Sequence, residues 1–178
     1  ENRSFTWQLV YKKKMEKFFE KLLGLAVIDP EIGFIIKSKK KNNLKSLSNI
    51  HDLIRKLEKN NQCIFLNERN DLPSHYSSFT DITVSISPHI QGALFQCLIN
   101  DKNFRGVIYD DSNLQFIEND LYFEGENQLI FRNFDLMIKK IRNFKSDFET
   151  EPKLGKWNKP QNHDPFTDGK GGKRVGNF

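Results

Sequence analysis

The stretch "DITVSISPHIQGAL", residues 81–94, decides the fold that we predict for this chain of 178 residues. Its first half, "DITVSIS", is rich in β-branched residues and is a short run of the kind that forms a strand. Pro88 then stands where the first turn of a helix would begin. A strand that leads directly into a helix is the repeating unit of parallel α/β sheets. We therefore interpret this stretch as one step of such a sheet.

The same alternation continues on both sides of this stretch. Before it we expect an amphipathic helix over 4–23, a strand over 32–39, a helix that begins at Ser48 and a strand over 63–66. After it we expect a helix over about 93–99, strands over 106–111 and 128–131, and a helix over 133–146. Short apolar strands separated by helices predict the α/β class, with a Rossmann-like parallel sheet and helices on both faces.

The composition favours anionic partners. Residues of the hydrophobic types make up 37% of the chain, the formal net charge is +5, and basic residues concentrate at 12–21, 37–45 and 139–145. Such a balance suits phosphates or a membrane surface. Aromatic residues do not alternate with the basic ones as they do in RNA-binding sheets, so nucleic acid is not an expected partner. No apolar run approaches the roughly 20 residues that span a bilayer.

Ligands of parallel α/β sheets bind where the strands end, and two stretches meet that condition. In the first, Ser85 and Ser87 close a strand, and His89 and Gln91 follow at the start of a helix. Unpaired backbone N–H groups and a partial positive charge make such a helix start suitable for a phosphate. The alternative is an ordinary Ser-Pro helix cap that serves no ligand.

The second stretch is "NERNDLPSHY", residues 67–76, after the strand at 63–66. Asn67, Arg69 and Ser74 are its candidate contacts with a nucleotide, and the alternative is a solvated loop. Asp110 and Asp111 also follow a strand, where they would hold Mg²⁺ or a hydroxyl group, or simply cap the next turn. We predict no metal site. The two cysteines lack metal-ligand spacing and are expected to be buried thiols.

The chain ends in "HDPFTDGKGGKRVGNF", residues 163–178. This tail resembles the C-terminal signature of bacterial surface and capsular polysaccharide biosynthesis proteins, which have the GT-B glycosyltransferase architecture. The positions that match the signature are Asp164, Pro165, Phe166, Asp168, Gly169, Lys170, Gly171, Gly172, Arg174 and Val175. A related tail occurs in non-hydrolysing UDP-N-acetylglucosamine 2-epimerases, which share the fold.

The resemblance implies that residues 1–148 form a single GT-B C-terminal lobe that binds a nucleotide-sugar, with the helix 4–23 leading in. Residues 149–178 would be a C-terminal tail that packs back on this lobe. Ser85, Ser87, His89 and Gln91 would lie near the donor phosphates. Lys170 and Arg174 would face a phosphate or the partner lobe. The donor, a CMP-, UDP- or GDP-linked sugar, is a substrate, and no further cofactor is expected.

The implied activity is transfer of a sugar from the nucleotide-sugar to a surface or capsular polysaccharide acceptor. The reaction would take place in the cytoplasm, at the inner face of the cytoplasmic membrane, with peripheral membrane contact considered. An N-terminal GT-B lobe would complete the enzyme, so this chain would be inactive alone, and its catalytic residues stay unassigned. One alternative is a 2-epimerase-like enzyme. Another is a non-catalytic lobe that docks a partner or an anionic membrane through 12–21 and 37–45.

Overall fold

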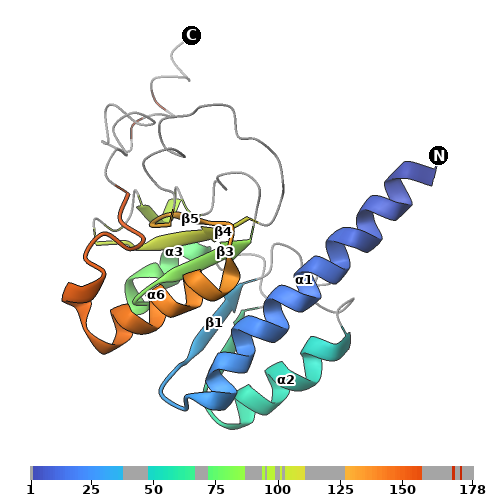
Figure 1. Cartoon of the computed structure of the whole chain (residues 1–178), viewed down its shortest axis with the longest axis horizontal. Coiled ribbons are helices and arrows are strands. Elements are labelled where there is room, and N and C mark those ends of the chain that lie inside the picture. Colours follow the sequence, from blue (N-terminus) through green and yellow to red (C-terminus); the bar gives the residue numbers. More distant parts are fainter. Residues whose placement is uncertain are drawn as a thin grey trace. The chain divides into compact units, whose positions relative to one another are not determined.

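The computed structural model describes residues 2–37, 48–66, 72–86, 94, 96–98, 101, 103–110, 127–157, 170 and 173. The chain divides into two compact units, Glu1–Leu72 and Pro73–Phe178. Each unit has its own parallel sheet, and helices flank both sheets (Figure 1). The predicted α/β class, with parallel strands and flanking helices, is therefore confirmed. The predicted division into 1–148 and 149–178 stays a prediction.

The first unit consists of two helices and two strands. These are α1 (Asn2–Ile28), β1 (Phe34–Lys37), α2 (Ser48–Lys59) and β2 (Cys63–Leu66). The strands β1 and β2 are parallel, with Phe34 opposite Cys63 and Lys37 opposite Leu66. The helix α1 is longer at both ends than the predicted helix over 4–23. Its apolar positions continue through the run 22–28, and the chain turns only at Asp29, whose carboxylate accepts a hydrogen bond from the backbone N–H of Glu31.

Apolar side chains from all four elements form the core of the first unit. Its buried members are Leu23, Ala26, Ile36, Ile50, Ile54, Leu57 and Cys63. Next to this core, the Gln62 side chain donates a hydrogen bond of 2.7 Å from Nε2 to the Ala26 carbonyl. This bond links the C-terminal part of α1 to the residue before β2, so residues distant in sequence are held together.

The second unit contains a three-stranded sheet. Its elements are α3 (Pro73–Tyr76), η1 (Ser77–Phe79), β3 (Thr83–Ile86), β4 (Gly106–Tyr109), β5 (Ile130–Phe131), α6 (Phe134–Ser146) and η2 (Phe148–Thr150). Residues 94 and 96–98 are also helical. The strands lie in the order β3-β4-β5 and are all parallel. Their sequence order is therefore also their spatial order.

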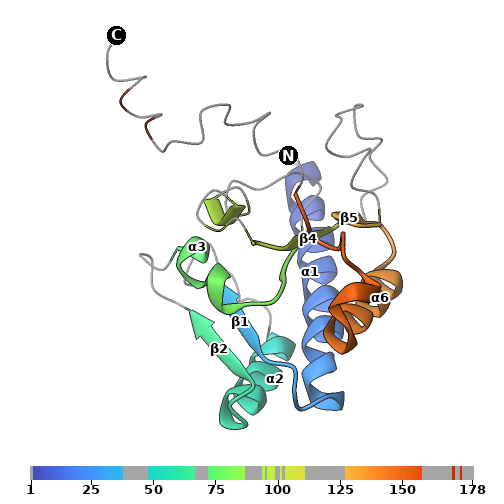
Figure 2. The same cartoon turned by 90° about the vertical axis from the view of Figure 1, so that its left-hand side faces the viewer.

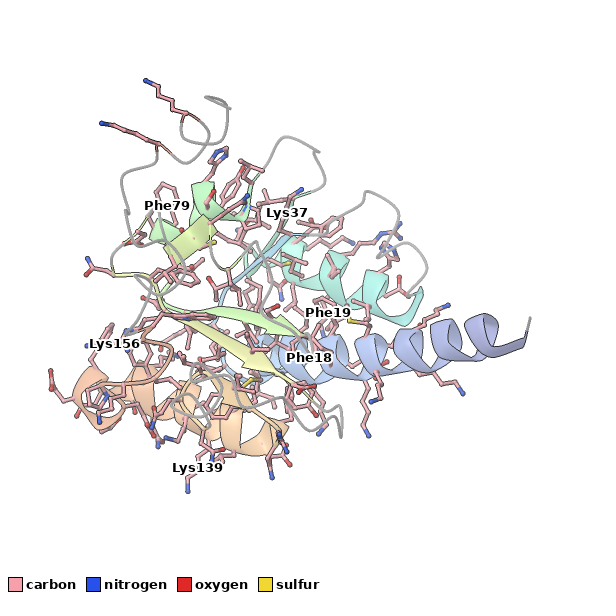
Figure 3. The ribbon with its side chains drawn as sticks, turned by 90° about the horizontal axis from the view of Figure 1, so that it is seen from above. Phe18, Phe19, Lys37, Phe79, Lys139 and Lys156 are labelled. Carbon is pink, nitrogen blue, oxygen red and sulfur yellow. The ribbon has the colours of Figure 1, made fainter. Side chains whose placement is uncertain are left out.

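Helices cover both faces of this sheet. On one face, Ile108 of β4 packs in a cluster with Leu94 and Cys97. On the other, the Tyr109 ring meets Phe134 of α6 edge-on, with 5.5 Å between the ring centroids. Figure 3 shows α6 (orange) on one side of the strands of this sheet. The prediction of helices on both faces is confirmed for this unit.

Residues 147–157, which we call the strap, follow α6 and run beside β4 (Figure 2). Gly155 accepts a hydrogen bond of 2.9 Å from the Gly106 N–H and donates one of 2.9 Å to the Gln128 carbonyl. The Trp157 indole N–H then donates to the Gly106 carbonyl at 3.0 Å. These bonds fix the strap to the amino end of β4.

Among the helices that the structure describes, none combines the length and the apolar character that a membrane span requires.

Candidate functional site

The carboxyl edge of the sheet in the second unit gathers polar groups from three neighbouring strands. Because β3, β4 and β5 are parallel, their carboxyl ends lie at the same edge. Ser85 is the penultimate residue of β3, Asp110 follows β4 and Arg132 follows β5. A hydroxyl, a carboxylate and a guanidinium group therefore lie where ligands of open α/β sheets bind.

Among the residues of this edge that the structure describes, Asp110 is the most deeply buried polar one, with 2% of its surface exposed. Its backbone N–H donates a hydrogen bond of 2.9 Å to the Phe131 carbonyl, so the pairing of β4 with β5 extends to this residue. A buried carboxylate needs hydrogen-bond donors to offset its desolvation. Asp110 is thus a fixed acceptor that suits hydroxyl or amide groups at the sheet edge.

Arg132 lies between the end of β5 and the first turn of α6, and its side chain is exposed. The next residue, Asn133, caps α6, because its Oδ1 accepts a hydrogen bond of 3.0 Å from the Leu136 N–H. The N–H groups at the start of α6 therefore already have a side-chain acceptor. The group next to this helix start that can bind an anion is the guanidinium of Arg132, because a guanidinium binds phosphate oxygens through two parallel N–H bonds.

A hydrogen-bonded serine links α3 and η1 to the helix that follows β3. Ser77 is buried, and its hydroxyl donates to the Ser74 carbonyl at 3.2 Å. Burial raises the pKa of the Cys97 thiol, and a side-chain hydrogen bond between Cys97 and Ser77 acts in the opposite direction. The segment formed by α3 and η1, which carries Ser74, is therefore linked to the helix after β3, which carries Cys97.

The structure describes three of the predicted site residues. Ser74 is half-buried on α3 and Ser85 is half-buried on β3, so both belong to the second unit. Lys170 is exposed, and its carbonyl accepts a hydrogen bond of 3.0 Å from the Lys173 N–H. The other predicted site residues lie outside the described residues and stay predictions: Asn67, Arg69, Ser87, His89, Gln91 and Arg174.

Sequence reasoning missed Arg132. The signal was present, because Arg132 comes directly after the predicted strand 128–131, and residues at strand ends are the ones that face ligands of a parallel sheet. Asp110 was considered only as half of a pair with Asp111, which lies outside the described residues. In the described ranges, no group of three or more His, Cys, Asp or Glu side chains could hold a metal ion.

The tail begins where the strap ends, at Trp157. Trp157 is bonded to Gly106, the first residue of β4, at the opposite end of the strand. A strand of four residues is about 13 Å long. Lys170 comes 13 residues after Trp157 (170 − 157), and that length of extended chain spans up to about 43 Å. This length of chain allows Lys170 to face a phosphate bound at the sheet edge, and the predicted role of Lys170, to face a phosphate or the partner lobe, stays a prediction.

Comparison of the chain with protein-family models, with curated proteins and with solved structures found no match.

Proposed function

We propose that this chain is the nucleotide-sugar-binding lobe of a GT-B type glycosyltransferase that acts on a surface or capsular polysaccharide. One observation carries the proposal. The carboxyl edge of the parallel sheet in the second unit gathers Ser85, Asp110 and Arg132. The resemblance of the tail to polysaccharide biosynthesis proteins supports a sugar donor over other nucleotides.

Each of these groups has a role that matches its chemistry. Arg132 would bind a phosphate oxygen of the donor, and the Ser85 hydroxyl would donate to a second one. Asp110, a buried acceptor, would hold a ribose hydroxyl group. Donors fixed around the diphosphate would stabilise the negative charge that develops on it as the sugar departs.

The proposed enzyme needs partners. The glycan acceptor and the general base would belong to an N-terminal GT-B lobe, as the resemblance implies. The described part of this chain would bind the donor without turning it over. Because both nucleotide-sugars and the growing glycan would have to reach the enzyme, we place the reaction in the cytoplasm, at the inner face of the membrane.

The test is titration of the whole chain with CMP, UDP, GDP and their sugar conjugates by calorimetry. A ligand that binds only the folded chain also raises its melting temperature, which provides an independent readout. We expect one nucleotide to bind. Arg132→Gln should weaken its affinity about tenfold or more, because a charge-assisted contact is lost. The matched control is Arg142→Gln, which removes an exposed guanidinium from the middle of α6.

Three results would count against the proposal. Absence of heat and of a melting shift with every nucleotide at millimolar concentration would contradict donor binding. An equal loss of affinity in both arginine variants would mean that general charge, and not the sheet edge, attracts the ligand. If NMR showed that the chain converts UDP-N-acetylglucosamine in the absence of any acceptor, the 2-epimerase alternative would be favoured.

A further inference from the structure

A row of lysines runs along one side of α1. Lys13, Lys17 and Lys21 follow one another at steps of four residues, and Lys14 stands beside them. All four side chains are exposed. Residues four apart in a helix lie one above the other on the same side. We call these four residues the lysine stripe.

The lysine stripe lies on the side of α1 that faces away from the core of the first unit. The α1 residues that pack in or against that core are Met15, Phe19, Leu23 and Ala26. With 3.6 residues per turn, these positions and the lysine stripe fall on opposite sides of the helix. Lys12 is three residues before Met15 and therefore lies on the core-facing side of α1, where it is half-buried and pairs with Glu16 at 3.9 Å, so it is not part of the stripe.

The charge on this part of α1 is concentrated. Residues 12–21 contain five lysines and two glutamates, which gives a net charge of +3 (5 − 2). From Lys13 to Lys21 the helix rises by about 12 Å, so the four ammonium groups of the stripe share a short, straight segment. After the helix, Asp29 and Glu31 carry negative charge, which limits the positive surface to the middle of α1.

We propose that the lysine stripe binds the anionic surface of a lipid bilayer. Lysine carries a compact, strongly hydrated charge on a flexible stem, which suits a diffuse layer of negative headgroups. Nucleic-acid sites instead combine basic residues with aromatic platforms or arginine forks, and the stripe contains neither. Because the four lysines lie in a straight row along the helix, all of them can contact a flat membrane surface at the same time. Within the described chain no helix can span a bilayer, so the contact is peripheral.

This inference is independent of the proposed function, because it rests only on α1. Exposed charges are screened by salt over about 8 Å at physiological ionic strength. Binding through the stripe is therefore salt-sensitive. It needs no nucleotide, and no part of the sheet edge in the second unit contributes to it.

The test is co-sedimentation of the whole chain with vesicles of phosphatidylcholine, pure or with about 30% phosphatidylglycerol, at low and high salt. We expect binding to the anionic vesicles at low salt only. Replacing all four lysines of the stripe by Gln should reduce the partition coefficient at least about tenfold. The matched control removes four exposed charges from the second unit, namely Lys139, Arg142, Lys153 and Lys156. Figure 3 shows Lys139 and Lys156 at the surface of that unit.

The control variant should keep most of the binding of the wild type, and circular dichroism should show that both variants are folded. Failure of the wild type to sediment with anionic vesicles at low salt would overturn the proposal. So would an equal loss of binding in the two variants, because total charge would then explain the result. Tighter binding of a fluorescent single-stranded RNA, lost specifically in the stripe variant, would identify the stripe as a nucleic-acid surface instead.

Discussion

The guanidinium group of Arg105 donates a hydrogen bond of 2.6 Å from Nη1 to the carbonyl oxygen of Leu154, 49 residues further along the chain. Nη1 also lies 3.3 Å from the Pro152 carbonyl. The guanidinium lies over the Phe144 ring at 4.7 Å from its centroid. Burial lowers the pKa of Arg105. One side chain therefore joins the residue before β4, the last turns of α6 and the strap.

We predict that Arg105→Lys lowers the free energy of unfolding by about 1–3 kcal/mol. Lysine keeps the charge but has no planar fork, so it cannot both reach the strap carbonyls and stack on Phe144. Urea denaturation measures the loss. Arg142→Lys, at an exposed position of α6, is the control and should change stability by less than about 0.5 kcal/mol. Similar values for the two variants would contradict the role of Arg105 in holding the strap.

Replacing Gly155 and Gly24 by alanine should change the stability of the chain in opposite directions. Gly155 in the strap has a φ of +67°, and an added Cβ would lie 3.0 Å from the Gly106 nitrogen. Gly24 lies inside α1 with nothing within 4 Å of an added Cβ. We expect Gly155→Ala to destabilise by about 2 kcal/mol or more, and Gly24→Ala to stabilise by about 0.5–1 kcal/mol. Thermal and urea unfolding would measure both, and a stabilised Gly155→Ala would refute the tight turn.

Secondary structure could be predicted because the signals are local. The strand 63–66 and the start of α2 at Ser48 agree with the prediction, and Pro73 and Asp29-Pro30 mark real boundaries. The hydrogen bonds of the strap could not be predicted. Its sequence reads as a linker, because the hydrogen bonds that order it come from Arg105, Gly106 and Gln128, which are distant in sequence.

The candidate site was predictable to a smaller extent. In any open parallel sheet, the residues at the carboxyl ends of the strands face the ligand. Ser85 and Asp110 could therefore be found from the strand pattern alone. The contact between Ser77 of η1 and Cys97 of the helix after β3 follows from tertiary packing. No sequence spacing predicts a hydrogen bond between two residues that are 20 positions apart (97 − 77).

The cap of α6 provides a local test. The Asn133 Oδ1 accepts a hydrogen bond of 3.0 Å from the Leu136 N–H. We predict that Asn133→Ala costs about 1 kcal/mol of stability and that Asn133→Asp restores most of it, because a carboxylate also accepts this bond and is favoured at a helix start. Chemical denaturation would measure both. Equal losses for Ala and Asp would show that the side chain contributes through something other than capping.

The last prediction concerns Cys63, which is buried in the core of the first unit. Burial, with a smaller contribution from the charge of Glu58, raises the pKa of its thiol to about 11 from the usual 9.0. The folded chain therefore holds this proton more tightly than the unfolded chain. The associated stability is present below pH 9 and is lost as the pH rises from about 9 to about 11. A thiol reagent at pH 8 should modify Cys63 only after unfolding, because the thiolate is the nucleophile.

The measurement is the free energy of unfolding at pH 8.5 and pH 10.5 for the wild type and for Cys63→Ala. Other groups titrate in this range in both proteins, so the difference between the two pH slopes isolates Cys63. We expect the wild type to lose about 1–2 kcal/mol more than the variant. Equal slopes, or rapid labelling of Cys63 in the folded chain at pH 8, would mean that this thiol reaches solvent and that the core of the first unit opens around it.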